Sequence, residues 1–100
     1  MRRAGKVDGT HKEIRGALRK AGVRVLGLGA YGNGVPDFAA SHRGFTCLVE
    51  AKSARGKLTD AQKRLLSEWE GVVIVAKSGE EAVSKFFLEY SCALLGRVLR

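Results

Sequence analysis

The feature that most constrains the fold is an unbroken apolar run, VVIVA, at residues 72–76. Consecutive apolar and mostly β-branched residues are typical of a strand that is covered on both faces. Segments of helical pattern flank this run. The first begins at a cap, Thr59 or Asp60, and reaches about Glu70, and the second covers about 79–96. The pattern therefore predicts an α/β sandwich, in which helices cover a sheet.

The first half of the chain predicts one helix and three strands. Apolar residues at helical spacing indicate a helix over 10–21, with Thr10 as its N-cap and Glu13 completing a capping box. The strands are expected to begin at Val23 and to cover 35–41 and 45–52. The order is then α-β-β-β-α-β-α, an antiparallel meander followed by a helical crossover, which gives a mixed sheet flanked by helices. We expect a single domain over residues 1–100, with a basic N-terminal arm over 1–9.

The net charge points to a polyanionic partner. Eighteen Lys and Arg oppose ten Asp and Glu, giving +8, and residues 1–24 alone carry eight basic and two acidic side chains. A concentrated basic surface attracts nucleic acid through counterion release, and a solvated face is the alternative. No apolar run approaches the ~20 residues of a membrane span, so a membrane is not an expected partner. Two cysteines and the lack of a secretory signal predict reduced thiols in a cytoplasmic compartment.

Three ionisable residues interrupt the predicted strands. Glu50 and Lys52 are two positions apart in the strand 45–52, so the strand period sends both to one face, where an ion pair at a solvated strand end is one interpretation. Asp37 shifts the balance, because an antiparallel neighbour can bring its carboxylate close to Glu50. Two such carboxylates repel unless a cation lies between them, and oxygen ligands are those that Mg²⁺ prefers. Lys52 could then orient a water or stabilise charge on a phosphate.

These residues also carry a family resemblance. The motif Gly34-Val35-Pro36-Asp37 followed by Glu50-Ala51-Lys52 resembles the PD-(D/E)xK nuclease signature. With Leu58-Thr59-x-x-Gln62 after it, and a segment from Asp8 to Ile14 similar to a first-helix motif, the chain most resembles the small stand-alone VRR-Nuc proteins of phages and bacteria. The resemblance spans about residues 8–85. It implies a restriction-endonuclease-like core and a Mg²⁺- or Mn²⁺-dependent endonuclease acting on DNA.

The resemblance implies a role for each residue of the motif. The metal ligands would be Asp37, Glu50 and the main-chain carbonyl of Ala51, and the catalytic lysine would be Lys52. Gln62 matches a second-helix glutamine of the family, and its place among Leu58, Leu65 and Leu66 on one helical face independently directs its amide toward the sheet. Glu13 matches a first-helix acidic residue that supports the metal site in relatives, and a plain capping glutamate is the alternative.

The remaining expectations concern DNA and self-association. The candidate DNA contacts are Lys12, Arg15, Arg19, Tyr31, Arg55 and Lys57. His11 is either a DNA or metal contact or a partly exposed helix histidine. The helix over 79–96 has more apolar residues than one face needs, which predicts a homodimer, although a long helix covering a small sheet is the alternative.

No recognition helix or zinc finger is apparent, so branched DNA such as Holliday junctions or flaps is the expected substrate. The alternatives are an archaeal-type Holliday junction resolvase and a non-catalytic DNA-binding module that keeps the nuclease fold. The resemblance places the activity in the cytoplasm of a bacterium or of a phage-infected host cell.

Overall fold

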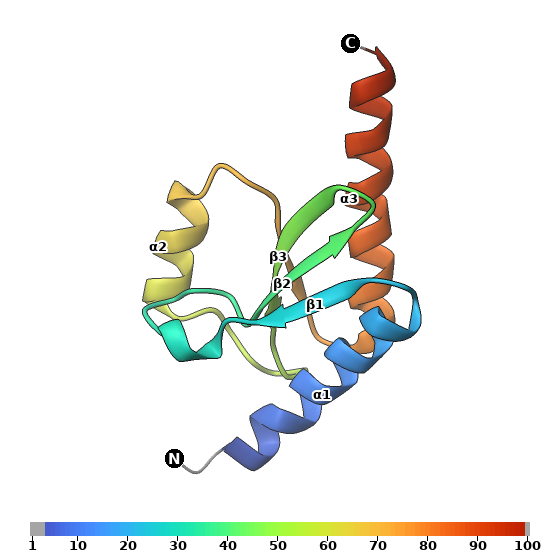
Figure 1. Ribbon diagram of the computed structural model, residues 1–100. Helices are drawn as coiled ribbons and strands as arrows, with labels where there is room; N and C mark the ends of the chain where they lie inside the picture. Colours follow the sequence, from blue (N-terminus) through green and yellow to red (C-terminus); the bar gives the residue numbers. More distant parts are fainter. Residues whose placement is uncertain (1–3, 100) are drawn as a thin grey trace.

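The chain forms a mixed four-stranded sheet with helices on both faces (Figure 1). The computed structural model describes residues 4–99, and the side chains of residues 9–97. The elements are α1 (Ala4–Lys20), β1 (Arg24–Gly27), the 3-10 helix η1 (Gly29–Tyr31), β2 (Phe38–His42), β3 (Phe45–Ala51), α2 (Asp60–Glu68), β4 (Val73–Ala76) and α3 (Gly79–Leu99). This order of helices and strands confirms the predicted α-β-β-β-α-β-α arrangement.

The strands are arranged in the sheet in their order along the chain, β1-β2-β3-β4. The pairs β1–β2 and β2–β3 are antiparallel, whereas β4 runs parallel to β3 after the crossover through α2. The β2–β3 hairpin turns at Arg43 and Gly44, which both have positive φ, as the right-handed twist of a two-residue hairpin requires. The predicted meander and crossover are therefore both present.

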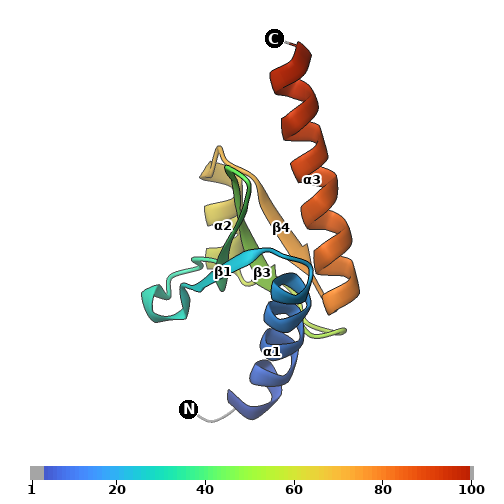
Figure 2. The ribbon, with the colours of Figure 1, turned by 45° about the vertical axis from the view of Figure 1, so that its right-hand side comes forward.

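The two faces of the sheet differ in how well they are covered. Helices α1 and α3 lie together on one face, and α2 lies on the other (Figure 2). The core fills the space under α1 and α3, and its largest members are Ile14, Leu18, Phe38, Phe45, Val49 and Phe86. In contrast, α2 contributes no buried residue. The face on the α2 side is therefore open over much of its area.

The N-terminal boundary differs from the prediction. Helix α1 already includes residues 4–9, which the prediction had placed in a basic arm before the helix, and residues 1–3 lie outside the described part of the chain. The predicted capping box is also wrong, because Thr10 lies inside the helix. A threonine can occupy a helix interior at modest cost, so a capping signal does not oblige a helix to begin there.

Two other boundaries differ from the prediction by a few residues. Strand β2 begins at Phe38 rather than at 35, because Pro36 has no N–H to give to a ladder. Helix α3 continues to Leu99, three residues beyond the expected end. Among the described residues, no helix combines the length and apolar character needed to cross a bilayer.

Candidate active site

Strand register brings the two predicted carboxylates together. Phe38 at the start of β2 pairs with Val49 of β3 in an antiparallel ladder. One step further along each strand, Asp37 therefore stands opposite Glu50. The predicted approach of these two residues is confirmed, and it follows from the pairing register that the β2–β3 hairpin imposes.

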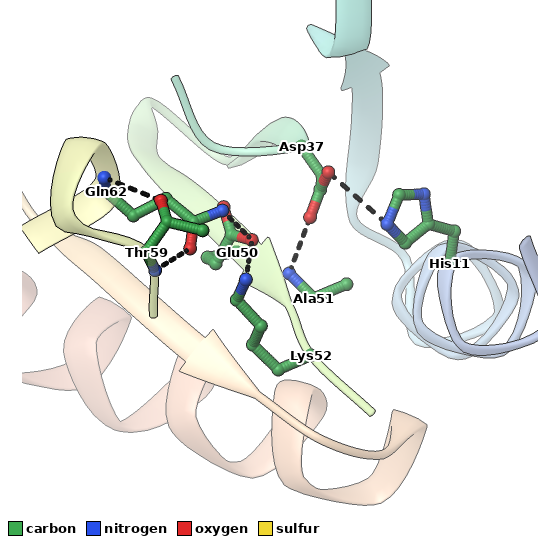
Figure 3. A network of polar contacts seen from close by, with 7 residues as sticks. All are labelled: His11, Asp37, Glu50, Ala51, Lys52, Thr59 and Gln62. Atoms are coloured by element: carbon green, nitrogen blue, oxygen red, sulfur yellow. Dashed lines mark hydrogen bonds and ion pairs between the residues drawn. The ribbon is translucent and has the colours of Figure 1, made fainter. Parts of the chain in front are cut away.

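Asp37 takes the place of a strand partner at the end of β3. Its Oδ2 accepts a hydrogen bond from the main-chain N–H of Ala51 at 2.8 Å, and its Oδ1 lies 3.3 Å from Nε2 of His11 (Figure 3). Main-chain groups alternate in direction along a strand, and the N–H of Lys52 donates to Ala76 of β4. The carbonyl of Ala51 therefore points toward the β2 side, where Asp37 lies.

Glu50 is a buried carboxylate with one cationic neighbour and one amide neighbour. Only 4% of the residue is exposed. Its Oε2 accepts a hydrogen bond from Nε2 of Gln62 at 3.0 Å and lies 3.6 Å from Nζ of Lys52. Burial, together with the charge of Asp37, raises the pKa of Glu50 to about 7, even though Lys52 acts to lower it. Asp37 and Glu50 are therefore unfavourable as two ionised carboxylates unless a positive charge is added between them.

Gln62 couples the start of α2 to Glu50. Its main-chain N–H donates to Oγ1 of Thr59 at 3.1 Å, and its Oε1 accepts from the main-chain N–H of Thr59 at 2.8 Å. This reciprocal capping box fixes the side chain, and its remaining amide group then faces Glu50. The prediction that this amide points toward the sheet is confirmed.

A glycine of the sequence motif allows the loop before β2 to lie against α2. Gly34 has φ of +82°, a region that side chains rarely adopt. A Cβ at this position would lie 2.5 Å from the carbonyl oxygen of Ala61 in the first turn of α2. The close approach holds the segment leading to Asp37 next to the helix that carries Gln62.

The first-helix residue at the site is His11 rather than Glu13. The carboxylate of Glu13 accepts a hydrogen bond from the main-chain N–H of Gly79 at 2.8 Å. Glu13 therefore caps the start of α3 and is not part of the site around Asp37 and Glu50. His11 instead contacts Asp37, and its ring packs edge-on against Phe38 with centroids 5.6 Å apart. Within the part of the chain that the structure describes, no three His, Cys, Asp or Glu side chains form a ready-made metal cluster.

The predicted DNA contacts come from three separate parts of the chain. Those on α1 are Lys12, Arg15 and Arg19, Tyr31 is on η1, and Arg55 and Lys57 follow β3. All are exposed except Arg15, which is half-buried. Arg19 donates a long 3.4 Å hydrogen bond to the carbonyl oxygen of Val25 at the edge of the sheet. Beside it, Arg24 of β1 is an exposed basic residue that the sequence interpretation did not include.

Comparison with protein-family models, with curated proteins and with solved structures finds no significant match to this chain. The VRR-Nuc resemblance therefore stays a prediction that depends on the motif. What the geometry adds is a carboxylate pair, one lysine and one amide at the end of a central strand. This combination of oxygen ligands and a neighbouring ammonium group is suited to a divalent cation and a phosphate ester.

Proposed function

We propose that the chain is a metal-dependent DNA endonuclease that hydrolyses phosphodiester bonds. The observation that carries the proposal is the opposed pair Asp37 and Glu50, with Lys52 on the side of Glu50. A purely structural ion pair would need one carboxylate for one lysine. Here burial and, after it, the charge of the second carboxylate raise the pKa of Glu50 and oppose folding, as expected where a site is shaped for a ligand rather than for stability.

The donor set fits Mg²⁺ or Mn²⁺. Asp37, Glu50 and the main-chain carbonyl of Ala51 offer hard oxygen ligands, and Mg²⁺ commonly uses one or two carboxylates together with substrate phosphate and water. When bound, the cation would polarise the scissile phosphate and lower the pKa of a water. Glu13 is not included in this set, because its carboxylate caps α3.

The chain's own residues would orient the ligands and neutralise charge. The N–H of Ala51 and the ring of His11 hold the two oxygens of Asp37, and Gln62 holds Glu50. Lys52 is partly exposed, so its ammonium group can reach a phosphate oxygen or an attacking water. A fixed cationic donor of this kind stabilises negative charge that develops on the phosphate during in-line attack.

Charge and fold together favour DNA recognised by its shape. The net charge of +8 supplies sequence-independent attraction to phosphates, and the sequence contains no motif of a helix that reads base edges. Branched DNA, such as Holliday junctions or flaps, is therefore the proposed substrate class, and the cytoplasm of a bacterium or phage-infected cell is the proposed compartment. An archaeal-type resolvase would be distinguished by paired symmetric nicks, and a non-catalytic module by binding without cleavage.

The test is cleavage of labelled duplex, flap and four-way junction DNA with and without Mn²⁺. Asp37→Asn and Lys52→Gln remove a charge while keeping a polar side chain, and each should lower the rate at least 100-fold. Asp60→Asn and Lys63→Gln make the same changes at exposed positions of α2 and should leave the rate unchanged. Cleavage that is independent of metal, or that survives both site substitutions, would exclude the proposed activity.

A homodimer formed through α3 is the second part of the proposal. The C-terminal half of α3 extends beyond the sheet (Figure 1). Leu88 and Leu95 are 63% and 58% exposed, and with the exposed Cys92 they follow the four-three spacing of a coiled-coil seam. This seam is distinct from the side of α3 that packs Phe86 into the core. Light scattering that reports a species of 10.8 kDa at micromolar concentration would contradict the dimer.

A further inference from the structure

The open face of the sheet holds a second polar site, away from the carboxylate pair. An open trough of about 730 Å³ lies across β1, β2 and β3 and reaches the end of α1. Small residues such as Ala39 and Ser41 form its floor, because register places them between Leu26 and Arg24 of β1 and the side chains of β3. We name this feature the sheet trough and define it by Arg19, Arg24, Leu26, Ala39, Ser41 and Thr46.

The chemistry of the sheet trough is that of an anion site. Two guanidinium groups, from Arg19 and Arg24, and two hydroxyl groups, from Ser41 and Thr46, line it, and no carboxylate is among its lining residues. Arg19 has one N–H directed to the carbonyl oxygen of Val25, which leaves its other donors for a ligand. Arginine and hydroxyl donors are the groups that most often contact DNA phosphates.

The position of the sheet trough matches the path of a nucleic acid that passes through the carboxylate pair. Along β3, Glu50 and Thr46 are four residues apart on the same face, or about 13 Å. Along α1, His11 and Arg19 are eight residues apart, or about 12 Å. At one phosphate per 3.4 Å of axis on each strand, this separation corresponds to about four base pairs of duplex.

We propose that the sheet trough binds the phosphodiester backbone of one duplex arm, about four base pairs from the bond that is cut. The inference rests on the proposed endonuclease function for its substrate. The open shape favours a polymer over an enclosed small molecule, and the exposed side chain of Leu26 can contact a deoxyribose. The trough would thereby hold an arm in place while the carboxylate pair meets the scissile phosphate.

The experiment measures DNA binding in EDTA, so that it does not depend on cleavage. Fluorescence anisotropy with labelled duplex and four-way junction DNA is recorded over a salt series for the wild type, Arg24→Ala and Arg97→Ala. Both substitutions remove one exposed arginine, but Arg97 is on α3 near the β2–β3 turn and outside the sheet trough. The long-range loss of charge is therefore the same in the two variants.

Arg24→Ala should weaken binding about five- to tenfold and lower the slope of log K against log salt by about 1, whereas Arg97→Ala should change affinity less than twofold. Equal effects of the two substitutions on affinity would overturn the proposal that the sheet trough binds DNA. Cleavage assays separate this failure from that of the endonuclease. If Arg24→Ala leaves metal-dependent cleavage unchanged, the proposed endonuclease activity stands and the proposed role of the sheet trough is rejected. Saturable binding of a mononucleotide in the trough, without competition by duplex, would also reject a backbone site.

Discussion

Replacing Glu50 by glutamine should stabilise the metal-free protein at pH 8. Glutamine has nearly the same shape, and its Oε1 can still accept the hydrogen bond from Nε2 of Gln62. What the substitution removes is a buried negative charge opposite Asp37. The raised pKa of Glu50 already includes the attraction of Lys52, so the ion pair with Lys52 does not offset the burial and the repulsion.

The size and sign of the effect follow from the pKa. The change from 4.5 to about 7 corresponds to about 3 kcal/mol at 1.36 kcal/mol per pKa unit. Because the folded-state pKa of this carboxyl is raised, its protonated form stabilises the fold below pH 4.5. That contribution is lost as the pH rises through about 7. The glutamine variant should therefore exceed the wild type in stability at pH 8, by up to about 3 kcal/mol, and match it near pH 4.

The assay is urea unfolding in EDTA at several pH values, with Glu68→Gln as a matched control on the exposed part of α2. The control should follow the wild type at every pH. Adding Mg²⁺ or Mn²⁺ should then stabilise the wild type, by about 2.7 kcal/mol at 100 times the dissociation constant, and should not stabilise Glu50→Gln. If Glu50→Gln unfolds more readily than the wild type at pH 8, Glu50 is a stabilising partner of Lys52 and the metal interpretation loses its basis.

Three further predictions concern the surroundings of the site. Gly34→Ala should destabilise the protein by at least about 2 kcal/mol more than Gly32→Ala in urea unfolding, because both positions have positive φ but only a Cβ at Gly34 meets the α2 backbone. At protein concentrations low enough to keep the chain monomeric, a thiol reagent should label Cys92 at once, because the α3 seam is then uncovered, and should label Cys47 only on unfolding, since burial raises the pKa of Cys47 to about 12; fast labelling of both contradicts this. His11→Ala should weaken Mn²⁺ binding about tenfold or more, with recovery in His11→Gln, whose amide can still donate to the carboxylate; equal affinities would show that the ring does not position the ligand.

The order of elements could be predicted because each signal is local. The apolar run at 72–76 became β4, and α2 begins at Asp60 behind the N-cap Thr59, one of the two caps that the sequence offered. The start of α1 could not be placed in this way, because Thr10 satisfies a capping pattern without requiring the helix to begin there. Local preferences indicate which structures are compatible with a segment, and contacts elsewhere decide how far each one extends.

The carboxylate pair was predictable for a different reason. A strand period of two and an antiparallel hairpin leave few ways to place Asp37 relative to Glu50 and Lys52. The sheet trough needed the register of β1 against β2, because Arg24 has no pattern in the sequence that separates it from other exposed arginines. Its neighbours Ser41 and Thr46 become a site only when the pairing aligns them on one face.

His11, and not the predicted Glu13, lies at the site, and helix geometry explains part of this difference. At about 100° per residue, His11 lies about 60° from the buried Ile14 on the side toward Leu18, whereas Glu13 lies about 100° from Ile14 in the other direction. The wheel therefore puts His11 nearer the packed face. It does not say which neighbour each side meets, since that depends on where α3 and the end of the sheet lie around α1. Glu13 meets the start of α3 and His11 meets Asp37, so a motif match at Glu13 cannot by itself assign a metal ligand.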